Sequence, residues 1–357
     1  MASRSMTETQ TDVTVGVDTH GEIHVAAAFT TGLGRPLGQL EIPTTPSGYR
    51  RLLVWARSFG ATVQFGVEGT GSFGAGLTRF LRSEGCSVIE VNRPNRQTRH
   101  SRGKSDPVDA EAAARAVLSG EATSIAKEDH QLVGMICSLR VARRSAVKMR
   151  TQIANQMHSL LITAPAELRE LLRGLSRDQL IARAASMRPG AVTTPLAATK
   201  LAMKGLALRH ELLAEELVTL DVELARLTKE AAPELCSLLG VGPDVAGALL
   251  VAVGDNPERL RSEGSFANLC GAALLPASSG KTSNRHRLSR GGDRIANGAL
   301  WRIVMTRLAS HQPTQDYMAR RTAQGLSKRE IVRCLKRYVA REVYRTLNLE
   351  RDLAGAA

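Results

Sequence analysis

Four acidic residues of this chain have the types and positions of a metal-binding catalytic site. Asp18 follows an apolar run in TVGVDTH, Glu68 follows one in VQFGVEGTGSFG, and Asp106 and Asp109 lie in KSDPVDAEAAARA. Each stands where a strand ends or a helix begins, so a carboxylate there can be held rigidly and remain open to solvent. Carboxylate oxygens gathered in this way suit magnesium, with manganese as a substitute. Taken singly, such residues are also ordinary turn or capping acids, with Asp106 as an N-cap before Pro107.

Hydrophobic periodicity predicts the elements that position these acids. Five strands are predicted over residues 11–17, 23–29, 37–42, 62–67 and 87–91. Helices are predicted from Pro46 to near Gly60, from Gly76 to Ser83 and from Pro107 onward. The order βββαβαβα is that of a ribonuclease H-like α/β domain, in which the first strand, the fourth strand and the last helix approach one another. The four acids would then converge, with the last two on one helix face.

The chain of 357 residues is strongly basic, which indicates a polyanion as its partner. It has 48 Lys and Arg against 34 Asp and Glu, and residues 281–345 alone hold 16 of the former and four of the latter. A second basic cluster lies directly before the Asp106 helix and consists of Arg93, Arg96, Arg99, Arg102 and Lys104. Aromatic residues make up only 3% of the chain, so contact with a phosphate backbone is favoured over base stacking. An isolated basic run is often a solvated face, but these runs flank the candidate catalytic residues.

Composition also argues against several classes of protein. No run of eighteen apolar residues is present, and MASRSMTETQTD at the N-terminus has neither a basic start nor a hydrophobic stretch. We therefore expect a cytoplasmic protein without a membrane segment. The five cysteines form no CxxC pair and the eight histidines no HExxH pattern, so zinc and disulfide frameworks are not expected. His20 and His24 are interpreted as strand and turn residues rather than as ligands.

Two long helices with heptad spacing are predicted between residues 126 and 230. In the first, one row is Leu132, Leu139, Ala146, Ile153 and Leu160, and an offset row is Met135, Ala142, Met149 and Gln156. In the second, a 4-3 spacing connects Leu206, His210, Leu213, Leu217, Leu220, Leu224 and Leu227. Proline and glycine residues interrupt the stretch between them, so we predict an antiparallel coiled-coil hairpin. We expect it to mediate dimerisation; the alternative is a pair of helices packed within one chain.

A mostly helical second globular unit is predicted over residues 231–350. The glycines of LLGVGP, Gly240 and Gly242, have the positions of a helix-hairpin-helix turn that brings backbone N–H groups to a phosphate. Further on, LPASSGK places Ser278 and Ser279 before a glycine. Basic residues follow these serines: Lys281, Arg285, Arg287, Arg290 and Arg294. A serine hydroxyl crowded by cations can attack a phosphodiester, and the alternative is a phosphate-binding loop in which both serines only donate hydrogen bonds.

The motifs together resemble one family of mobile-element enzymes. GVDTH, VEGTGSFG, KSDPVDA, the heptad helices and PASSGK with RLSRGGDR are similar, in that order, to the insertion-sequence DEDD transposases. The resemblance runs from Val13 to Leu347. It implies a RuvC-like domain over residues 13–125, a coiled-coil domain over 126–230 and a serine transposase domain over 231–350. Residues 1–12 would be a disordered tail, and residues 351–357 would be a second tail.

The resemblance also implies roles for individual residues. Asp18, Glu68, Asp106 and Asp109 would be the metal-site acids, and Ser279, directly before glycine, would be the nucleophile, with Ser278 as the alternative. Donor and target DNA would be the substrates, a structured non-coding guide RNA (a bridge RNA) would select them, and a homodimer or homotetramer would act. We therefore expect a recombinase that excises and inserts its own element. The alternatives are a RuvC-like junction-resolving nuclease without a covalent intermediate and, more remotely, an actin-like ATPase.

Overall fold

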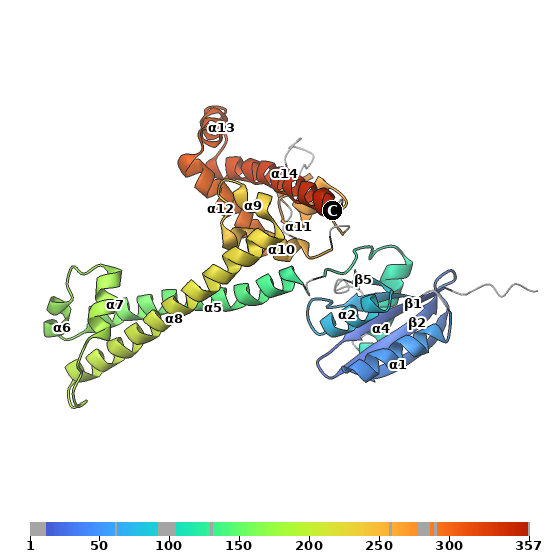
Figure 1. Ribbon diagram of the computed structural model, residues 1–357, viewed down its shortest axis with the longest axis horizontal. Coiled ribbons are helices and arrows are strands. Elements are labelled where there is room, and N and C mark those ends of the chain that lie inside the picture. The colour runs from blue at the N-terminus through green and yellow to red at the C-terminus, as the bar shows by residue number, and fades with distance from the viewer. Residues whose placement is uncertain are drawn as a thin grey trace, which may run out of the picture. The chain divides into compact units, whose positions relative to one another are not determined.

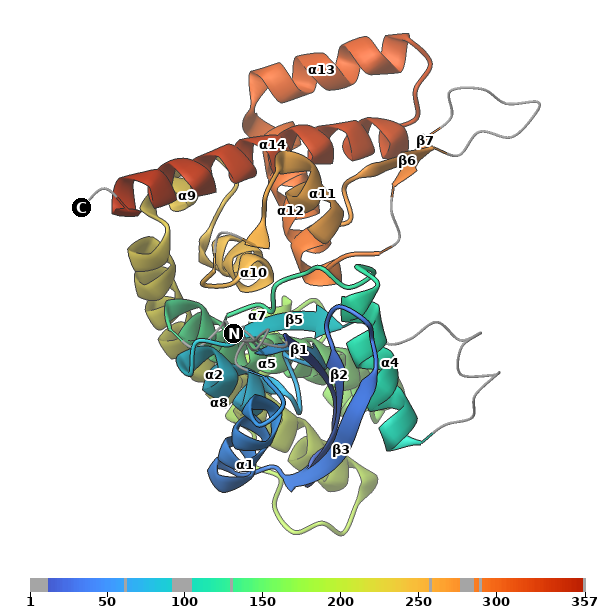
Figure 2. The ribbon, with the colours of Figure 1, turned by 90° about the vertical axis from the view of Figure 1, so that its right-hand side faces the viewer.

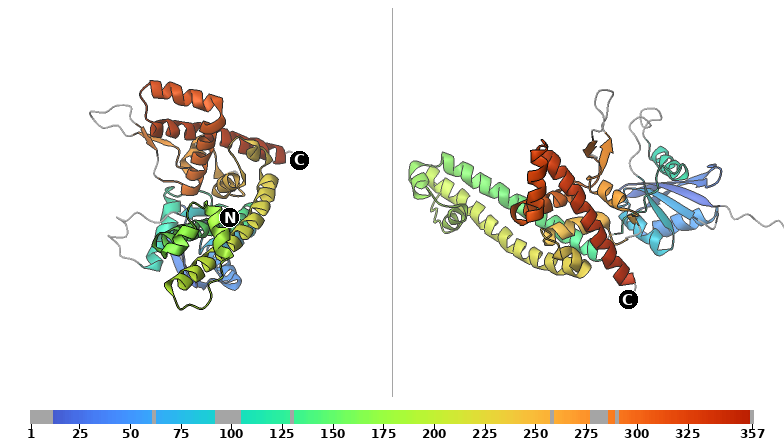
Figure 3. Two further views of the ribbon diagram at one scale, coloured as in Figure 1. Left: turned by 90° about the vertical axis from the view of Figure 1, so that its left-hand side faces the viewer. Right: turned by 90° about the horizontal axis from the view of Figure 1, so that it is seen from above.

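The computed structural model describes residues 12–60, 63–91, 105–128, 131–256, 259–276, 286–288 and 291–355. The chain divides into two compact units between Glu128 and Asp129. Figures 1, 2 and 3 show the elements of both units from four directions. Each unit is described by itself.

The first unit is built on the predicted five-stranded mixed sheet, which is confirmed. Its strands are β1 (Val13–Thr19), β2 (Ile23–Thr30), β3 (Pro36–Pro43), β4 (Val63–Glu68) and β5 (Ser87–Val91). Their order across the sheet is β3-β2-β1-β4-β5. The hairpin strand β2 is antiparallel to β1, whereas β4 is parallel to β1 and β5 is parallel to β4. The central pair, β1 and β4, therefore ends at the same edge of the sheet.

Helices cover both faces of this sheet, as the side-chain alternation requires. The helices α1 (Pro46–Arg57) and α2 (Ala75–Ser83) lie on one face, and α4 (Asp106–Leu118) lies on the other (Figure 2). On the first face, Val13, Val15 and Val17 of β1 are fully buried in the core beneath α1 and α2. On the second face, alanines of α4 pack against alternate residues of β2. Successive residues of β1 and β4 thus face opposite helices.

Two glycines allow α4 to approach the sheet closely. A Cβ atom at Gly16 of β1 would overlap the carbonyl oxygen of Ala110 and the nitrogen of Ala114, both in α4. A Cβ atom at Gly66 of β4 would lie 2.6 Å from the side chain of Val117. Only a residue without a side chain fits such a backbone approach. This close packing brings the first turn of α4 to the ends of β1 and β4.

The second unit begins with a helical hairpin. Its long helices, α5 (Leu132–Thr163) and α8 (Pro195–Ala231), lie along each other, with α6 (Ala166–Leu171) and α7 (Arg177–Ala185) at the far end (Figure 1). The predicted row on α8 is buried within the chain, as Leu206, Leu217 and Leu224 show. By contrast, Met135 and Met149 of the offset row on α5 are 49% and 46% exposed. The α8 row is therefore occupied by packing within this unit.

The rest of the second unit is the predicted mostly helical domain. Its elements are α9 (Pro233–Ser237), α10 (Pro243–Val253), α11 (Glu263–Leu269), β6 (Leu274–Pro276), β7 (His286–Leu288), α12 (Arg294–Ser310), α13 (Gln312–Ala323) and α14 (Lys328–Gly355). The core is formed mainly by apolar side chains of α10, α12 and α14, and α13 lies beside α14 (Figures 2 and 3). Among the described residues, no helix has the length and apolar character needed to span a bilayer.

Candidate active site

Two of the predicted acids lie side by side at the ends of the central parallel strands. Val17 of β1 is paired with Val67 of β4, so Asp18 and Glu68 are the next residues on the two strands. The Thr19 hydroxyl donates a hydrogen bond to the Glu68 carbonyl oxygen at 2.8 Å and ties the strand ends together. Since Val17 and Val67 face α1 and α2, alternation turns Asp18 and Glu68 towards α4. Asp18 is buried and Glu68 is half-buried.

The other two acids occupy the first turn of α4. Asp106 and Asp109 are both in this turn, one helical turn apart on the same side. Ser105, in an extended conformation, is the N-cap residue of the helix. The interpretation of Asp106 as the N-cap is therefore wrong by one residue, because Asp106 already has helical geometry. As N-terminal residues, both acids are stabilised by the positive end of the helix dipole.

We expected all four acids to be open to solvent, but the structure buries two of them. The Asp106 side chain is 50% exposed, but Asp18 and Asp109 are each only 6% exposed. The close packing of α4 on Gly16 and Gly66 explains this burial, because it seals the inner side of the cluster. The site therefore has two buried carboxylates behind a solvent-facing one.

A histidine that sequence reasoning set aside completes the cluster. His20 Nε2 lies 3.1 Å from Asp18 Oδ2 and 3.4 Å from Asp106 Oδ1. One ligand atom from each of these three residues lies within 4.8 Å of the others. The spacing of His20 could have indicated this position from the sequence. His20 is two residues after Asp18, and residues at that spacing share one face of an extended chain. It was missed because the histidines were compared only with zinc motifs.

Burial and like charges oppose ionisation of Asp18. Burial is the largest cause that raises the pKa of Asp18, and the charges of Asp109 and Asp106 raise it further, whereas His20 acts in the opposite direction. The net shift is upward. Carboxylates held this close repel one another unless a cation lies between them. The residues therefore fit a divalent cation, with oxygen donors from the acids and one nitrogen donor from His20.

The predicted serine residues lie outside the described residues, but the segments on either side are described. Ser278, Ser279, Lys281, Arg285 and Arg290 fall in the undescribed ranges 277–285 and 289–290, as the cluster from Arg93 to Lys104 falls in 92–104. The serines lie in the connection between β6 and β7, which pair as an antiparallel ribbon. Arg287 belongs to β7, opposite Leu275, and Arg294 is the first residue of α12.

Polar side chains of α12 and α14 hold the backbone at Cys270 and Gly271, which precede β6. The backbone N–H of Asp293, before α12, donates a hydrogen bond to the carbonyl oxygen of Leu269, the last residue of α11, at 2.6 Å. The Asn297 amide donates to the carbonyl oxygens of Cys270 and Gly271 at 2.7 and 3.0 Å. Its own oxygen accepts a hydrogen bond from Lys336 Nζ at 2.7 Å. Sequence reasoning missed this group, since no local motif connects α12 with α14.

We expect Asn297→Ala to destabilise the second unit. Lys336 is 7% exposed and burial lowers its pKa, so the alanine leaves a buried amine and two carbonyl groups without this partner. Such a loss costs about 2 kcal/mol of unfolding free energy, measurable as a lower urea midpoint by circular dichroism. Lys336→Met is the matched control, and the double variant should lose less than the sum of the two single ones. An unchanged midpoint for Asn297→Ala would contradict this role.

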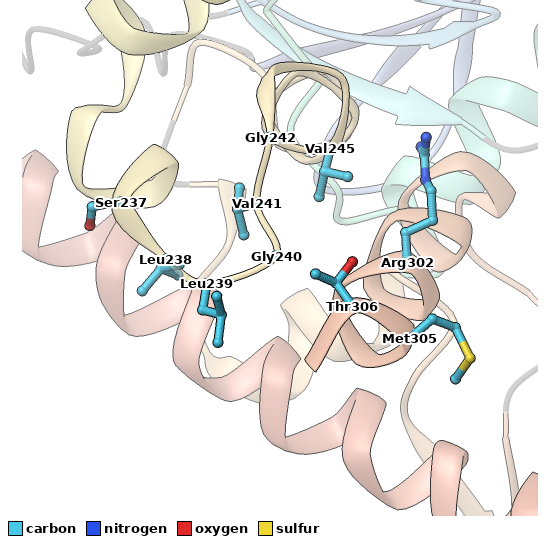
Figure 4. Close-up of a pocket in the computed structure, with 10 residues that line it drawn as sticks. All are labelled: Ser237, Leu238, Leu239, Gly240, Val241, Gly242, Val245, Arg302, Met305 and Thr306. Carbon is cyan, nitrogen blue, oxygen red and sulfur yellow. The ribbon is translucent and has the colours of Figure 1, made fainter. Parts of the chain in front are cut away.

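The predicted helix-hairpin-helix turn connects α9 to α10. Gly240 has a φ of +87°, and its Cβ position is 3.2 Å from the Ile303 carbonyl oxygen on α12. Gly242 is the N-cap residue of α10. An open pocket of about 640 Å³ lies along this turn, with Gly240 and Gly242 on one side and Arg302 and Thr306 of α12 on the other (Figure 4). Glycine is thus required at residue 240 both by backbone conformation and by contact with α12.

A partly buried ion cluster lies in the first turn of α10, directly after this turn. Asp244, in the first turn of α10, accepts hydrogen bonds from Arg140 Nε and Nη2 at 3.2 and 3.1 Å and from Arg302. Burial raises the pKa of Asp244, but the hydrogen bonds and charges of Arg302 and Arg140 outweigh it, so the pKa is lowered overall. The cluster connects α5 of the hairpin with α10 and α12.

Comparison with known families identifies the chain. A DEDD transposase model of the IS110 type matches residues 15–164. A second model, for transposases of the IS116/IS110/IS902 family, matches residues 232–319. The chain belongs to the IS110 family of transposases. No curated protein matches it.

The family membership indicates the kind of reaction and the substrate class of the described site. The transposase is an enzyme that acts on DNA, which agrees with the excess of positive charge. The first match contains β1 from Val15 onward, β4 and α4 with all four acids, and the second contains β6, β7 and α12. A DEDD transposase domain indicates dependence on a divalent metal, and the acidic cluster with His20 is the candidate site.

Proposed function

We propose that this IS110-family transposase excises and inserts its element through a composite site of four acids and a nucleophilic serine. The observation that carries the proposal is the grouping of Asp18 and Asp106 with His20, with Asp109 near enough to raise the pKa of Asp18 and Glu68 at the end of the neighbouring strand β4. Four carboxylates in one place repel a DNA phosphate unless a cation intervenes. They would hold magnesium, or manganese in its place, and the bound ion would supply electrostatic stabilisation of the scissile phosphate.

In this proposal Ser279 breaks the DNA strand. Its Oγ forms a bond to phosphorus while the bond from phosphorus to one sugar oxygen breaks. The serine proton is lost, the departing sugar oxygen gains a proton, and the DNA end is held as a phosphoserine diester. Attack by a hydroxyl group of another DNA end reverses the chemistry and rejoins the strands. Basic residues neutralise the charge on the phosphate oxygens, and we assign this role to Lys281, Arg285 and Arg287.

Other basic and glycine-rich segments would hold the nucleic acid. Backbone binding is assigned to Arg93, Arg96, Arg99, Arg102, Lys104, Arg290 and Arg294. The turn at Gly240 and Gly242 would place backbone N–H groups of α10 beside a phosphate. Support comes from the open pocket that this turn lines together with Arg302, which also pairs with Asp244 of α10. A structured guide RNA would choose donor and target, which leaves base recognition to nucleic-acid pairing.

The proposal is tested by reconstituted recombination. The purified chain, with any RNA that copurifies, is incubated with donor DNA carrying its own element and with target DNA in magnesium. We expect recombinant junctions, detected by sequencing, that disappear when EDTA is added or when the RNA is digested. Junctions that persist after RNA digestion would remove the guide from the proposal. Cleavage without rejoining would favour the junction-resolving nuclease.

We further propose that the helical hairpin joins two copies of the chain. Since the predicted α8 row is buried within the chain, self-association would use a different row, in which Leu201, Leu208 and Leu212 are 50%, 48% and 65% exposed. Their spacings of seven and four residues place them on one helix face. The site in each copy has its serine and its acids in different units, so a second copy can bring one beside the other.

Leu212→Glu is expected to weaken self-association at least tenfold, because it places a charge in an apolar contact surface. The measurement is the dissociation constant from light scattering or sedimentation. Val54→Glu is the matched control, because Val54 is 71% exposed on α1, outside the hairpin. If Leu212→Glu assembles like the wild type, the exposed row does not join the copies.

A further inference from the structure

His20 contributes the nitrogen atom of the acidic cluster and lies close to two of its carboxylates. His20 lies between Asp18 and Asp106, within hydrogen-bonding distance of the first and at 3.4 Å from the second. Its side chain is 48% exposed, whereas the Asp18 side chain is 9% exposed. The imidazole therefore stands at the mouth of the site, where its Nε2 faces both a buried and an exposed carboxylate.

The backbone of His20 is fixed from two directions. Its N–H donates to Nδ1 of His24 at 3.3 Å, and its carbonyl oxygen accepts a hydrogen bond from Thr44 Oγ1 at 3.4 Å. His24 is fully buried and stacks on Tyr49, with ring centroids 5.9 Å apart and planes 5° apart. This support behind the turn holds His20 on the side of the acids. A ligand that is held in place before the metal arrives loses little freedom on binding.

The spacing of the donor atoms fits one cation. The His20 nitrogen and the Asp18 and Asp106 oxygens all lie within 4.8 Å of one another. Ligand atoms on opposite sides of a metal ion with bonds of about 2.1 Å are about 4.2 Å apart. Small side-chain movements, on the order of half an ångström, therefore bring the three atoms into one coordination shell. A protonated lysine or arginine here would balance the negative charge but has no lone pair to donate to a metal, whereas a neutral imidazole has one.

We propose that His20 is a nitrogen ligand of the catalytic metal and that it biases the site towards manganese over magnesium. The inference rests on the proposed metal site and adds to it a ligand outside the four acids. Magnesium strongly prefers oxygen ligands, whereas imidazole nitrogen suits transition metals. The site would therefore use magnesium through the acids and bind manganese more tightly because of His20.

The test measures metal binding by the full-length chain without DNA. The EDTA-treated protein is titrated with MnCl₂ and with MgCl₂, and the manganese complex is studied by pulsed electron paramagnetic resonance. Wild type should show ¹⁴N modulation from a directly bound imidazole. In His20→Asn and His20→Gln this modulation should be lost, and the ratio of manganese to magnesium affinity should fall roughly tenfold. His158→Asn, which alters an exposed histidine of α5, should behave like the wild type.

The outcomes separate this inference from the function on which it rests. Persistent nitrogen modulation and an unchanged affinity ratio in both His20 variants, with normal circular dichroism, would overturn the ligand role. Asp18→Asn should lose tight binding of both ions whether or not His20 is a ligand. If Asp18→Asn binds manganese like the wild type, the proposed metal site is wrong, and so is the proposed ligand role of His20. Formation of the covalent adduct by Ser279 is measured separately on DNA gels.

Discussion

Ser279→Ala should bind DNA as tightly as the wild type and form no covalent protein–DNA adduct. The substitution removes one oxygen atom from a segment flanked by glycine and basic residues, so charge-driven affinity should change little. Chemistry should fall by about 10⁵-fold or more, as when a nucleophile is removed from an enzyme that depends on it. The measurement is denaturing electrophoresis of the protein with labelled DNA after quenching.

Ser278→Ala is the matched control for this experiment, because it removes the same atom from the neighbouring residue. We expect it to retain the adduct. An adduct that survives in Ser279→Ala and disappears in Ser278→Ala would move the nucleophile by one residue. Strand cleavage by wild type and by both variants with no adduct in any of them would instead favour hydrolysis by a metal-dependent junction-resolving nuclease.

Asp18→Asn should reduce recombination in magnesium by about 10³-fold or more, because it removes a charged ligand from the centre of the site. Asparagine is preferred to alanine, since Asp18 is 6% exposed and a cavity would confuse loss of metal with loss of packing. The amide keeps the shape of the carboxylate. The measurement is the yield of recombinant junctions at saturating magnesium.

The stability of the same variant separates a catalytic loss from an unfolded protein. Burial, Asp109 and Asp106 raise the pKa of Asp18, so above that pKa the ionised carboxylate reduces the stability of the metal-free fold. Removal of the charge should therefore leave the melting temperature without metal equal to or above that of the wild type. Asp178→Asn, on an exposed side chain of α7, is the activity control. Recombination by Asp18→Asn at the wild-type level would refute the metal-site assignment.

The ribonuclease H-like core could be predicted from the sequence because its strands are short and strongly patterned. Strands with alternating valines and the turns between them carry enough local information to predict the element order βββαβαβα, and the structure confirms the mixed sheet with the strand order β3-β2-β1-β4-β5. The prediction that the four acids converge rests on the order of the elements, and the structure groups two of them, Asp18 and Asp106, with His20. Parallel strands β1 and β4 end at one edge, and α4 must cross the face towards which Asp18 and Glu68 point.

Other features depend on contacts between segments that are far apart in the sequence. Heptad spacing predicted the helices α5 and α8, but a leucine row has the same pattern whether its partner is the same chain or another copy. The structure assigns the α8 row to packing within the unit, as burial of Leu217 and Leu224 shows. Likewise, Asn297 and Lys336 are 39 residues apart, and nothing local indicates that they meet beside Cys270 and Gly271.

The sequence by itself determined which elements form, which acids stand at their ends and that the partner is a polyanion. These properties depend on local periodicity, on helix and strand boundaries and on total charge, all of which are written along the chain. Only the tertiary structure decided how deeply those acids are buried and which neighbour joins them. Close packing of α4 on Gly16 and Gly66 buries Asp18 and Asp109, and the support of His24 holds His20 beside them. Burial and proximity are properties of packed surfaces, so no single segment of the chain encodes them.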